Sequence, residues 1–337
     1  MVQALLIAPL IVSFLVTLIC VPYWIRRARM AQLVGIDMHK LDKRRVAEIG
    51  GVPVLIGFLA GVFVYIGIIT FYFQVAKDNY QTLAILTTIL ITSMIGLIDD
   101  ILGWKIGLRQ WQKPVLTFFA SIPMIVMNAG SSDVGLPLFG IVDLSYLYTF
   151  LMVPLGIVGA ANGFNMIGGY NGLEAGMGTI ILSAIGLIAY SSGKGGLAII
   201  AFSMVTAIAA FLVYNKYPAR IFPGNTFTYM VGTLIACLAI MGNIEKLALL
   251  MFLPYFAELV LKARGLLQKE SFAHLLPDGS LTEPHDKWYG IEHVAITLLR
   301  KIHGRAMEKD VVWALLFIES VLAFTALAIF YLKVGVF

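Results

Sequence analysis

Ten long apolar segments divide the sequence, and they constrain its fold more than any other feature. A helix crosses the hydrocarbon core of a bilayer with roughly 20 mostly apolar residues, and in lipid the backbone must satisfy its own hydrogen bonds. The segments are continuously apolar and do not alternate, which argues against a β-barrel. We therefore predict an all-α polytopic membrane protein with about ten transmembrane helices, forming one integral membrane domain over residues 1–337. The predicted spans are 4–24, 50–73, 81–98, 114–130, 141–161, 173–190, 196–214, 226–242, 246–262 and 311–332.

The basic residues fall unevenly between the two sets of connections that these spans create. The chain has 24 Lys and Arg, and only Lys77, Lys194, Lys246 and Lys333 follow even-numbered spans. Connections rich in Lys and Arg remain in the cytoplasm, so the connections after odd-numbered spans are predicted to be cytoplasmic. Both termini are then extracytoplasmic, in a protein of the cell (plasma) membrane whose polar motifs face the cytoplasm.

One connection, residues 263–310, is long enough to form structure of its own. Ile291, Val294, Leu298 and Ile302 recur there at helical spacing, and basic residues follow them. This pattern predicts an amphipathic helix that lies on the protein or on the membrane surface.

Two adjacent carboxylates end the third span, in the run Gly-Leu-Ile-Asp-Asp that closes at Asp100. Asp99 and Asp100 would meet the negative end of the helix dipole, which is an unfavourable place for an acid. One interpretation is a solvated helix end. The other is a cation site, because Mg²⁺ favours oxygen ligands.

The fifth span runs into a turn that is unusually rich in asparagine and glycine. Glycine lets the backbone approach a ligand closely, and asparagine offers neutral donors and acceptors. The alternative is a flexible connection between two spans. The polar and glycine residues of interest in this turn are Asn162, Asn165, Gly169, Asn171 and Glu174.

A third motif follows the seventh span and contains Phe222, Asn225 and Thr226. Asn225 or Thr226 would serve as the N-cap of the next helix in the simplest interpretation. In the functional one, Phe222 stacks on a base and Asn225 reaches a metal or a phosphate.

Three further ionisable residues stand out by position. Lys113 precedes a proline at the start of the fourth span, where it is either an interfacial anchor or a phosphate contact. Glu258 and Glu319 lie within apolar segments, and charged groups there are functional candidates. The sequence offers no partner for either of them.

Taken together, three motifs resemble those of the polyprenyl-phosphate N-acetylhexosamine-1-phosphate transferases. The closest branch is the dolichyl-phosphate N-acetylglucosamine-1-phosphotransferases of eukaryotes and archaea. The motifs are G-L-I-D-D-I-L ending at Leu102, N-x-x-N-x-x-x-G-x-N-G-L-E ending at Glu174, and Y-P-A-R-x-F-x-G-x-T-F ending at Phe227. The resemblance covers the whole chain and implies ten spans with the active site on cytoplasmic loops.

The resemblance also implies roles for individual residues. Asp99 and Asp100 match the essential acidic pair, and Lys113 matches a lysine near the phosphates. Asn165, Asn225 and Asp100 are the expected metal ligands, for Mg²⁺ or alternatively Mn²⁺. The expected substrate-binding residues, with Gly169 and Asn171 near uridine and Phe222 stacked on uracil, are Asn162, Gly169, Asn171, Glu174, Phe222, Arg264 and His285.

Two departures from the family pattern affect these expectations. The second metal ligand of the family is an aspartate, and here that position is Asn225, so the site loses one negative charge. The Arg-His-Arg cluster of eukaryotic members is missing from the last cytoplasmic loop. The cations available in its place are Arg264, Lys269, His274 and His285.

The implied reaction moves N-acetylglucosamine-1-phosphate from UDP-GlcNAc to a dolichyl or polyprenyl phosphate and releases UMP. Implied partners are the UDP-sugar, the lipid phosphate, the bilayer and a second copy in a homodimer, and no nucleic acid. One rival is the same reaction with another donor, such as UDP-MurNAc-pentapeptide. A second rival is a secondary transporter, although transport sites usually lie near the membrane midplane and not at span ends.

Overall fold

The fold is almost entirely helical in the computed structural model, which describes residues 6–74, 79–136 and 140–333. Lys77 lies outside these residues. Gly103, with a φ of 74°, interrupts the helix α4 (Asn79–Ile106) near its end. The elements are α2 (Ala8–Met30), α3 (Gly51–Gly67), η1 (Ile68–Tyr72), α4 (Asn79–Ile106), α5 (Gln112–Ala120), α6 (Ile122–Val126), α7 (Ser145–Leu147), η2 (Tyr148–Met152), α8 (Val153–Phe164), α9 (Leu173–Ser191), α10 (Gly195–Asn215), α11 (Gly224–Gly242), α12 (Glu245–Met251), α13 (Leu253–Arg264), α14 (Ile291–His303) and α15 (Glu308–Tyr331).

Within the described residues, eight helices are long and apolar enough to cross a membrane, and they coincide with eight of the ten predicted spans. The other two predicted spans are each divided into two shorter helices, α5 with α6 and α12 with α13. Pro123 and Pro254 occupy the second positions of α6 and α13. Proline cannot donate the backbone bond that would continue the preceding helix, but it fits the first turn of a new one.

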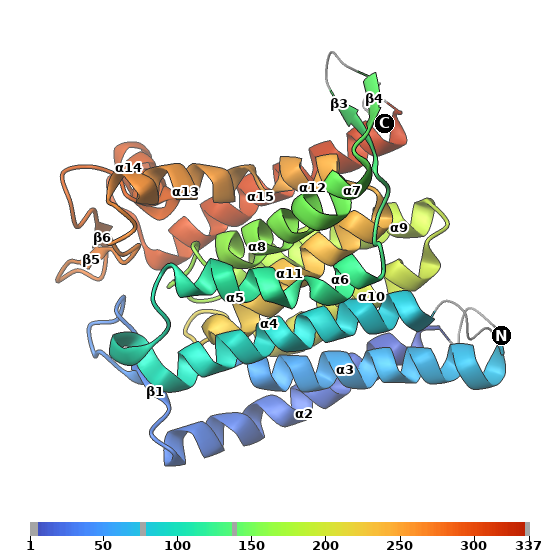
Figure 1. The fold of residues 1–337 in the computed structure, drawn as a ribbon. Coiled ribbons are helices and arrows are strands. Elements are labelled where there is room, and N and C mark those ends of the chain that lie inside the picture. The colour runs from blue at the N-terminus through green and yellow to red at the C-terminus, as the bar shows by residue number, and fades with distance from the viewer. Residues whose placement is uncertain (1–5, 75–78, 137–139, 334–337) are drawn as a thin grey trace.

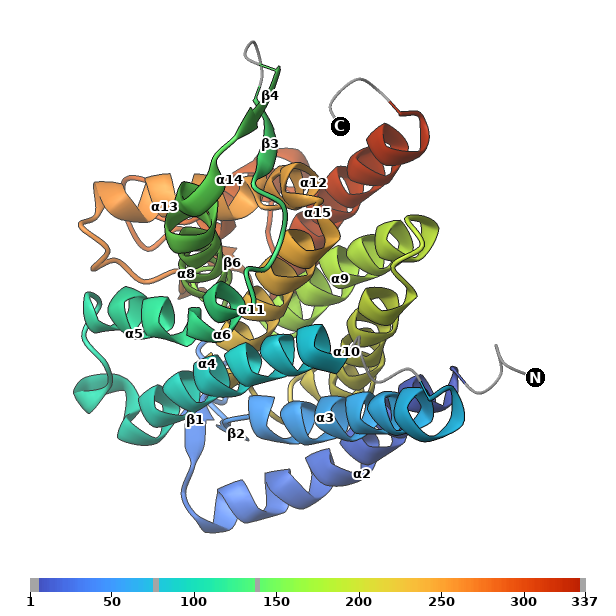
Figure 2. The same ribbon diagram turned by 45° about the vertical axis from the view of Figure 1, so that its right-hand side comes forward.

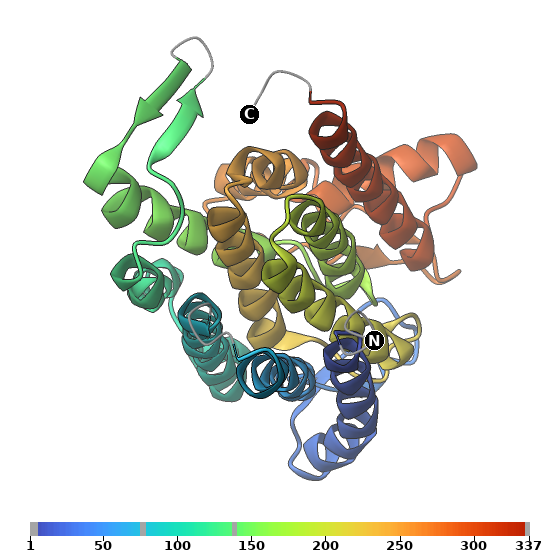
Figure 3. The same ribbon diagram turned by 90° about the vertical axis from the view of Figure 1, so that its right-hand side faces the viewer.

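The helices form a bundle around α11. Figure 3 shows most of them nearly end-on, with α11 in gold between the α4 side and the α9–α10 pair. α11 packs against α4, α8, α3 and α9, while α2 lies against α3 and α10, and α15 lies on α9. Most of α11 is buried, whereas most residues of α2 and α15 are only partly buried or exposed. The polar start of α11 is therefore held inside the bundle by helices from both halves of the chain.

Small residues let the neighbouring helices approach α11 closely. A Cβ at Gly96 of α4 would come within 2.5 Å of the carbonyl oxygen of Asn225. A Cβ at Gly51 of α3 would come within 2.3 Å of the backbone nitrogen of Phe227. Such contacts are the usual means of packing helices in lipid, where no hydrophobic force drives them together. They fix α3 and α4 against the first turn of α11.

Three antiparallel two-stranded ribbons complete the fold: β1 (Val34–Ile36) with β2 (Arg45–Ala47), β3 (Asp133–Leu136) with β4 (Gly140–Asp143), and β5 (His274–Leu275) with β6 (Leu281–Thr282). β1, β5, β6 and α14 lie at the end of the bundle where α4 ends and α5 and α15 begin (Figure 1). We call this the motif end. The start of α2, the end of α15 and the β3–β4 hairpin lie at the opposite end (Figures 1 and 2).

Candidate active site

Asp99 is the acid around which the motif end is organised. Its carboxylate is 5% exposed and accepts three bonds. The Lys113 ammonium of α5 lies 2.7 Å from Oδ2, the Asn225 amide of α11 donates to Oδ2 at 2.8 Å, and the Leu108 N–H donates to Oδ1 at 2.7 Å. Three positively polarised partners compensate for the unfavourable dipole at the end of α4. Asp99 therefore joins three separate segments of the chain.

Asp100 caps the first turn of α11 from a different helix. Its Oδ1 accepts the N–H of Asn225 at 2.7 Å, and its Oδ2 accepts the N–H and the hydroxyl of Thr226 at 2.9 and 2.7 Å. The first N–H groups of a helix lack partners within the helix, and its dipole favours an anion there. Gly224 has a φ of 72°, and a Cβ there would lie 2.7 Å from Oδ2 of Asp100. The N-cap role considered for Asn225 and Thr226 thus belongs to Asp100.

The asparagines at the end of α8 are joined to the same network. The Thr228 hydroxyl donates to Oδ1 of Asn165 at 2.5 Å and also lies 3.2 Å from the carbonyl oxygen of Asn225. The Asn162 amide donates to the Thr117 hydroxyl of α5 at 2.9 Å. The structure therefore brings Asp99, Asp100, Lys113, Asn165 and Asn225 into one connected group, with Asn162 beside it.

Glu174 and Asn171 hold the glycine-rich turn in shape. Glu174 is buried, and its Oε1 accepts the N–H of Gly169 at 3.1 Å. Gly169 has a φ of 88°, and a Cβ there would approach the ring of Phe272 to 2.8 Å. The Asn171 side chain donates to Asp37 at 3.0 Å. The side chains of Asn171 and Glu174 therefore bind other parts of the protein and hold the turn.

A buried charged cluster connects this turn to the start of α15. Lys40 pairs with Asp37 at 3.3 Å and with Glu308, and its ammonium lies 4.2 Å from the centre of the Tyr217 ring. The N–H of Asn171 donates to Glu308 at 2.9 Å. Asp37, Lys40 and Glu308 are each less than a tenth exposed. Buried charges are tolerated when they are paired in this way, and removing one partner leaves the others uncompensated.

His39 lies beside that cluster and is neutral near pH 7. Its ring lies 4.4 Å from the Tyr170 ring, and its Nε2 accepts the N–H of Ala273 at 3.2 Å. Burial lowers the pKa of His39 to about 4; the Asp37 charge acts in the opposite direction and the Lys40 charge in the same one. His39 thus holds the connection of residues 263–310 against the glycine-rich turn.

Glu258, which had no partner in the sequence, has several in the structure. Its carboxylate lies 3.3 Å from the Lys262 ammonium and accepts the N–H of Ile291 at 2.7 Å. Next to it, Glu292 accepts the N–H of Gly168 at 3.3 Å. Burial raises the pKa of Glu292 well above its usual range, with the Glu258 carboxylate adding to this and Lys262 opposing it. The start of α14 is thereby attached to the glycine-rich turn.

The remaining predicted site residues lie outside this network in the described part of the chain. Phe222 is half-buried, and its backbone pairs with Ala47 and Gly50. Arg264 is exposed at the end of α13. Neither Arg264 nor His285 gives a hydrogen bond or an ion pair to Asp99 or Asp100 in the described part of the chain. His285 lines a cavity of about 360 Å³ together with Lys269, Pro284, Asp286, Lys287 and Tyr289.

Thr117, Thr226 and Thr228 take part in the network but were not predicted as site residues. Thr226 lies within the third motif and Thr228 directly follows it, both in the first two turns of α11, so their position was an available signal. Thr117 stands one turn after Lys113 on α5. Asp37 gave no signal of its link to the glycine-rich turn, because Asn171, which donates to it, is 134 residues away in the sequence.

The donor set of this group fits a hard divalent cation. Asp99, Asp100, Asn165 and Asn225 offer only carboxylate and amide oxygens, the ligands that Mg²⁺ prefers. Among the described residues, no group of three or more His, Cys, Asp or Glu could hold a metal. A soft metal site of the zinc type thus has no candidate there, and a metal at the motif end depends on amide oxygens as well as on the two acids.

Comparison with known proteins places this arrangement in a family. Residues 82–243 match the family described as glycosyl transferase family 4. A protein of Saccharolobus solfataricus is 33% identical over 325 residues, 95% of each chain, and one of Sulfolobus acidocaldarius is 34% identical over 273 residues, 80% of this chain and 81% of the relative. Both carry the provisional name UDP-N-acetylglucosamine–dolichyl-phosphate N-acetylglucosaminephosphotransferase.

A more distant relative carries the name of a different transferase. The phospho-N-acetylmuramoyl-pentapeptide-transferase of Streptococcus thermophilus is 27% identical over 305 residues, 82% of this chain and 89% of the relative. The apolar bundle and these similarities define an integral membrane transferase. The chain belongs to glycosyl transferase family 4 and, within it, resembles the two archaeal proteins over most of its length.

Proposed function

We propose that the protein transfers N-acetylglucosamine-1-phosphate from UDP-GlcNAc to a dolichyl or polyprenyl phosphate. The supporting observation is the position of the Asp99, Asp100, Lys113, Asn165 and Asn225 group at one end of a membrane bundle. A water-soluble donor and a lipid-borne acceptor can meet only at such an end. The names of the two archaeal relatives support the choice of donor and acceptor. The product would be a lipid-linked sugar pyrophosphate, a first intermediate for N-glycans or surface glycans.

The bond changes of this reaction are simple. An oxygen of the lipid phosphate forms a bond to the β-phosphorus of the donor. The bond between that phosphorus and the bridging oxygen breaks, and UMP leaves with the bridging oxygen. Both reactants are anions, so the principal task of the protein is to neutralise charge and to position them.

Lys113 supplies positive charge that is already fixed in place. Its ammonium is held 2.7 Å from Asp99 and is 23% exposed, so it remains available to a phosphate oxygen. Asp99 in turn is oriented by the Leu108 N–H and the Asn225 amide. A preorganised cation of this kind needs no rearrangement when the transferring group becomes more negative.

Asp100, Asn165 and Asn225, with Asp99 beside them, would hold the divalent metal, for which we propose Mg²⁺ with Mn²⁺ as an alternative. When bound, the metal would supply positive charge next to the pyrophosphate of the donor. Asp100 is fixed by the first turn of α11 and Asn165 by Thr228, so both oxygen ligands are held by the protein itself. Asn225 contributes a neutral oxygen, and the total ligand charge is lower than with an aspartate.

The predicted substrate-binding residues outside the network would bind the nucleotide and the sugar. Phe222 is half-buried and stands three residues before Asn225, and its ring would stack on uracil. Gly169, with its positive φ, presents backbone close to where the donor would lie. Arg264 and His285 would contact the pyrophosphate or the sugar from the last connection. Asn162, which binds Thr117 one turn after Lys113, would contact the substrate on the α5 side. Asn171 and Glu174 would support binding indirectly, because they hold the glycine-rich turn in shape.

We infer that the motif end faces the cytoplasm. The connections at this end carry the great majority of the Lys and Arg residues, which is the usual mark of the cytoplasmic side. UDP-sugars are cytoplasmic metabolites, so the orientation agrees with the proposed donor. Single cysteines at exposed His274 of the motif end and at exposed Ser192 of the opposite end would report the orientation. Only the cysteine at position 274 should be protected from an impermeant thiol reagent in intact cells.

A donor-by-acceptor assay tests the proposal. Purified protein is given UDP-GlcNAc, UDP-MurNAc-pentapeptide or UDP-glucose with dolichyl or undecaprenyl phosphate, and the lipid products are weighed by mass spectrometry. We expect the UDP-GlcNAc product and an equal amount of UMP, dependent on Mg²⁺ and on the lipid phosphate. The more distant relative makes UDP-MurNAc-pentapeptide the second candidate donor. A product from that donor alone would overturn the assignment of the sugar.

A further inference from the structure

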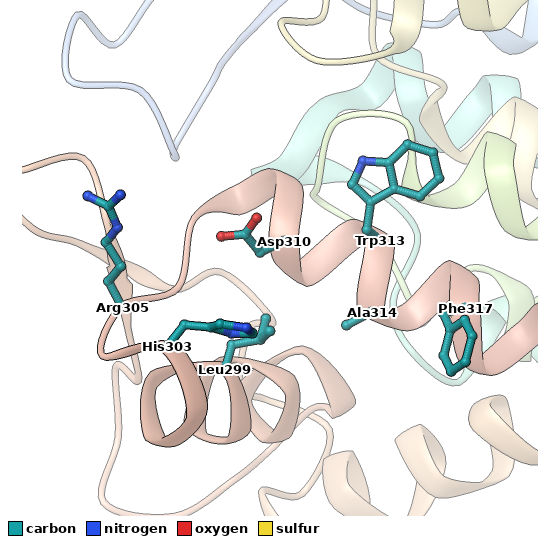
Figure 4. Close-up of a pocket in the computed structure, with 7 residues that line it drawn as sticks. All are labelled: Leu299, His303, Arg305, Asp310, Trp313, Ala314 and Phe317. Carbon is teal, nitrogen blue, oxygen red and sulfur yellow. The ribbon is translucent and has the colours of Figure 1, made fainter.

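A second cavity at the motif end lies between α14 and α15, away from the acidic pair. Its volume is about 590 Å³. Figure 4 shows its lining: α14 contributes one apolar and one basic side chain, the connection contributes an arginine, and α15 contributes an acid and an apolar wall. The lining residues are Leu299, His303, Arg305, Asp310, Trp313, Ala314 and Phe317.

The polar edge of this cavity carries an arginine and a histidine whose side chains are free to bind. The side chains of His303 and Arg305 are exposed, and neither takes part in a hydrogen bond or an ion pair in the described part of the chain. The neighbouring Arg300, by contrast, is paired with Glu283. The acid at the edge, Asp310, already accepts the N–H of Met307 at 3.1 Å and lies in the first turn of α15, where a negative charge is favourable. The edge therefore presents the Arg305 guanidinium and the His303 imidazole to a ligand.

A second acid, which interacts with Arg305, is also occupied. Asp278, whose carboxyl interacts electrostatically with Arg305, accepts both the N–H and the hydroxyl of Ser280 at 3.0 and 2.7 Å. These bonds lower the pKa of Asp278, with Arg305 as a minor contributor. An anion at the cavity would thus meet a guanidinium that no acid neutralises by direct contact. A guanidinium binds phosphate oxygens through two parallel bonds.

The apolar wall continues from the cavity along the outer face of α15. Trp313 and Phe317 are each 70% exposed, and the exposed side chains of Val321 and Phe324 follow at spacings of four and three residues. These spacings place all four on one face of the helix. From residue 313 to residue 324 the helix rises ~16 Å, about the thickness of one leaflet of the hydrocarbon core. A hydrocarbon chain fits such a stripe, and a small soluble anion does not need it.

The apolar side of α14 supports a position at the membrane surface. Leu298 and Ile302, one turn apart, are 53% and 71% exposed. A helix with an exposed apolar stripe and a basic end lies in the interface plane of a bilayer. Arg305 and His303 are then at headgroup depth, and the stripe on α15 leads into the acyl region.

We propose that this cavity is a binding site for an anionic phospholipid of the adjacent leaflet. Its phosphate contacts Arg305 and His303, and one of its chains lies along Trp313, Phe317 and Phe324. The proposal does not depend on the reaction that the protein catalyses, because it concerns binding alone. The start of α14 is attached to Gly168 through Glu292, so a lipid that holds the end of α14 against α15 also steadies the glycine-rich turn.

Native mass spectrometry of the full-length protein tests the site directly. The protein is released from nanodiscs that contain phosphatidylcholine with phosphatidylglycerol, and retained lipids are counted. We expect one phosphatidylglycerol to be retained preferentially. The double variant Arg305→Gln/His303→Gln should weaken its binding ~10-fold or more, because the phosphate loses both its guanidinium partner and its imidazole partner. Phe317→Ala should weaken it as well, because the chain loses part of its contact surface.

Controls separate this site from general attraction to a basic surface. Arg29→Gln removes an exposed cation at the motif end of α2 and should leave the retained lipid unchanged. Thermal unfolding of each variant in phosphatidylcholine alone shows whether it folds. Equal retention by wild type and the Arg305→Gln/His303→Gln variant would overturn the proposal. Competition by inorganic phosphate, or preference for a polyprenyl phosphate over phosphatidylglycerol, would also overturn it, by indicating a free-anion site or an acceptor site.

Discussion

Asp100 at the end of α4 accepts both the backbone N–H and the hydroxyl of Thr226 in the first turn of α11. One carboxylate thereby fixes the start of α11, the most buried of the spanning helices that the structure describes. The same carboxylate belongs to the candidate site. The arrangement explains how a weak sequence signal, two acids at a helix end, becomes a defined geometry. If Asp100 also acts in the proposed reaction, stability and activity are coupled at this position.

Replacement of Asp100 should separate these two roles. Asp100→Ala removes the cap and should lower stability by about 1–2 kcal/mol, as the loss of other N-caps does. Asp100→Asn keeps one acceptor oxygen, so it should cost less stability while turnover still falls ~100-fold or more, because the charge is lost. Unfolding in mixed micelles and UMP release measure the two effects. Full activity of Asp100→Asn would exclude its charge from catalysis.

Lys113 and Asp99 should behave as an energetically coupled pair. Each single variant, Lys113→Gln or Asp99→Asn, leaves the other charge without its partner in a largely buried position. The double variant should therefore be more stable than the sum of the single effects predicts, by about 1 kcal/mol, a value reduced by the partial exposure of Lys113. A double-mutant cycle of unfolding free energies measures this. Strict additivity would mean that the ion pair contributes nothing.

Asn225→Asp tests what the neutral ligand does. The Asn225 amide donates to Asp99 at 2.8 Å, and an aspartate would set two carboxylates against each other there. Without metal the variant should be less stable than wild type, and Mg²⁺ should raise its melting temperature more than it raises that of wild type. Asn243→Asp, at an exposed position at the opposite end of α11, is the matched control and should respond as wild type does. An equal response of Asn225→Asp would indicate that this position does not face the metal.

The buried His39 should make stability depend on pH. Its pKa is lowered from 6.5 to about 4, so the unfolded chain binds more protons between these values and stability falls as the pH decreases. Below pH 6.5 wild type should lose ~1.4 kcal/mol per pH unit relative to His39→Gln, until the pH nears 4. The comparison between variants removes the opposite contributions of Glu48 and Glu292, whose pKa values burial raises. Exposed His274→Gln is the control, and the same slope in wild type and His39→Gln would contradict the account.

The sequence predicted most of the fold because the strongest force on this chain is visible in it. Long apolar runs and the distribution of Lys and Arg were enough to find eight spanning helices. The breaks at Pro123 and Pro254 were missed, since hydropathy averaged over a window hides a single residue. Both prolines are visible in the sequence, and their effect on helices is well defined.

The grouping of the candidate site residues was predictable where they belong to motifs that follow alternate spans. It was not predictable where a residue contacts another that is far away in the sequence. Asp99, Asp100, Lys113, Asn165 and Asn225 were expected together, and they lie in one network. The cluster of Asp37, Lys40 and Glu308 could not be predicted, because nothing near Lys40 in the sequence points to a glutamate 268 residues away. Thr228 is intermediate, since a hydroxyl one turn after a ligand is common in helices without any role.

Transfer of the β-phosphorus is the central claim, and isotope labelling tests it most directly. UDP-GlcNAc labelled with ³²P in the β-phosphate is incubated with the purified protein, Mg²⁺ and a polyprenyl phosphate. The account predicts that the label moves to the lipid and that unlabelled UMP is released in equal amount. Label that remains in UDP while the sugar alone reaches the lipid would contradict it.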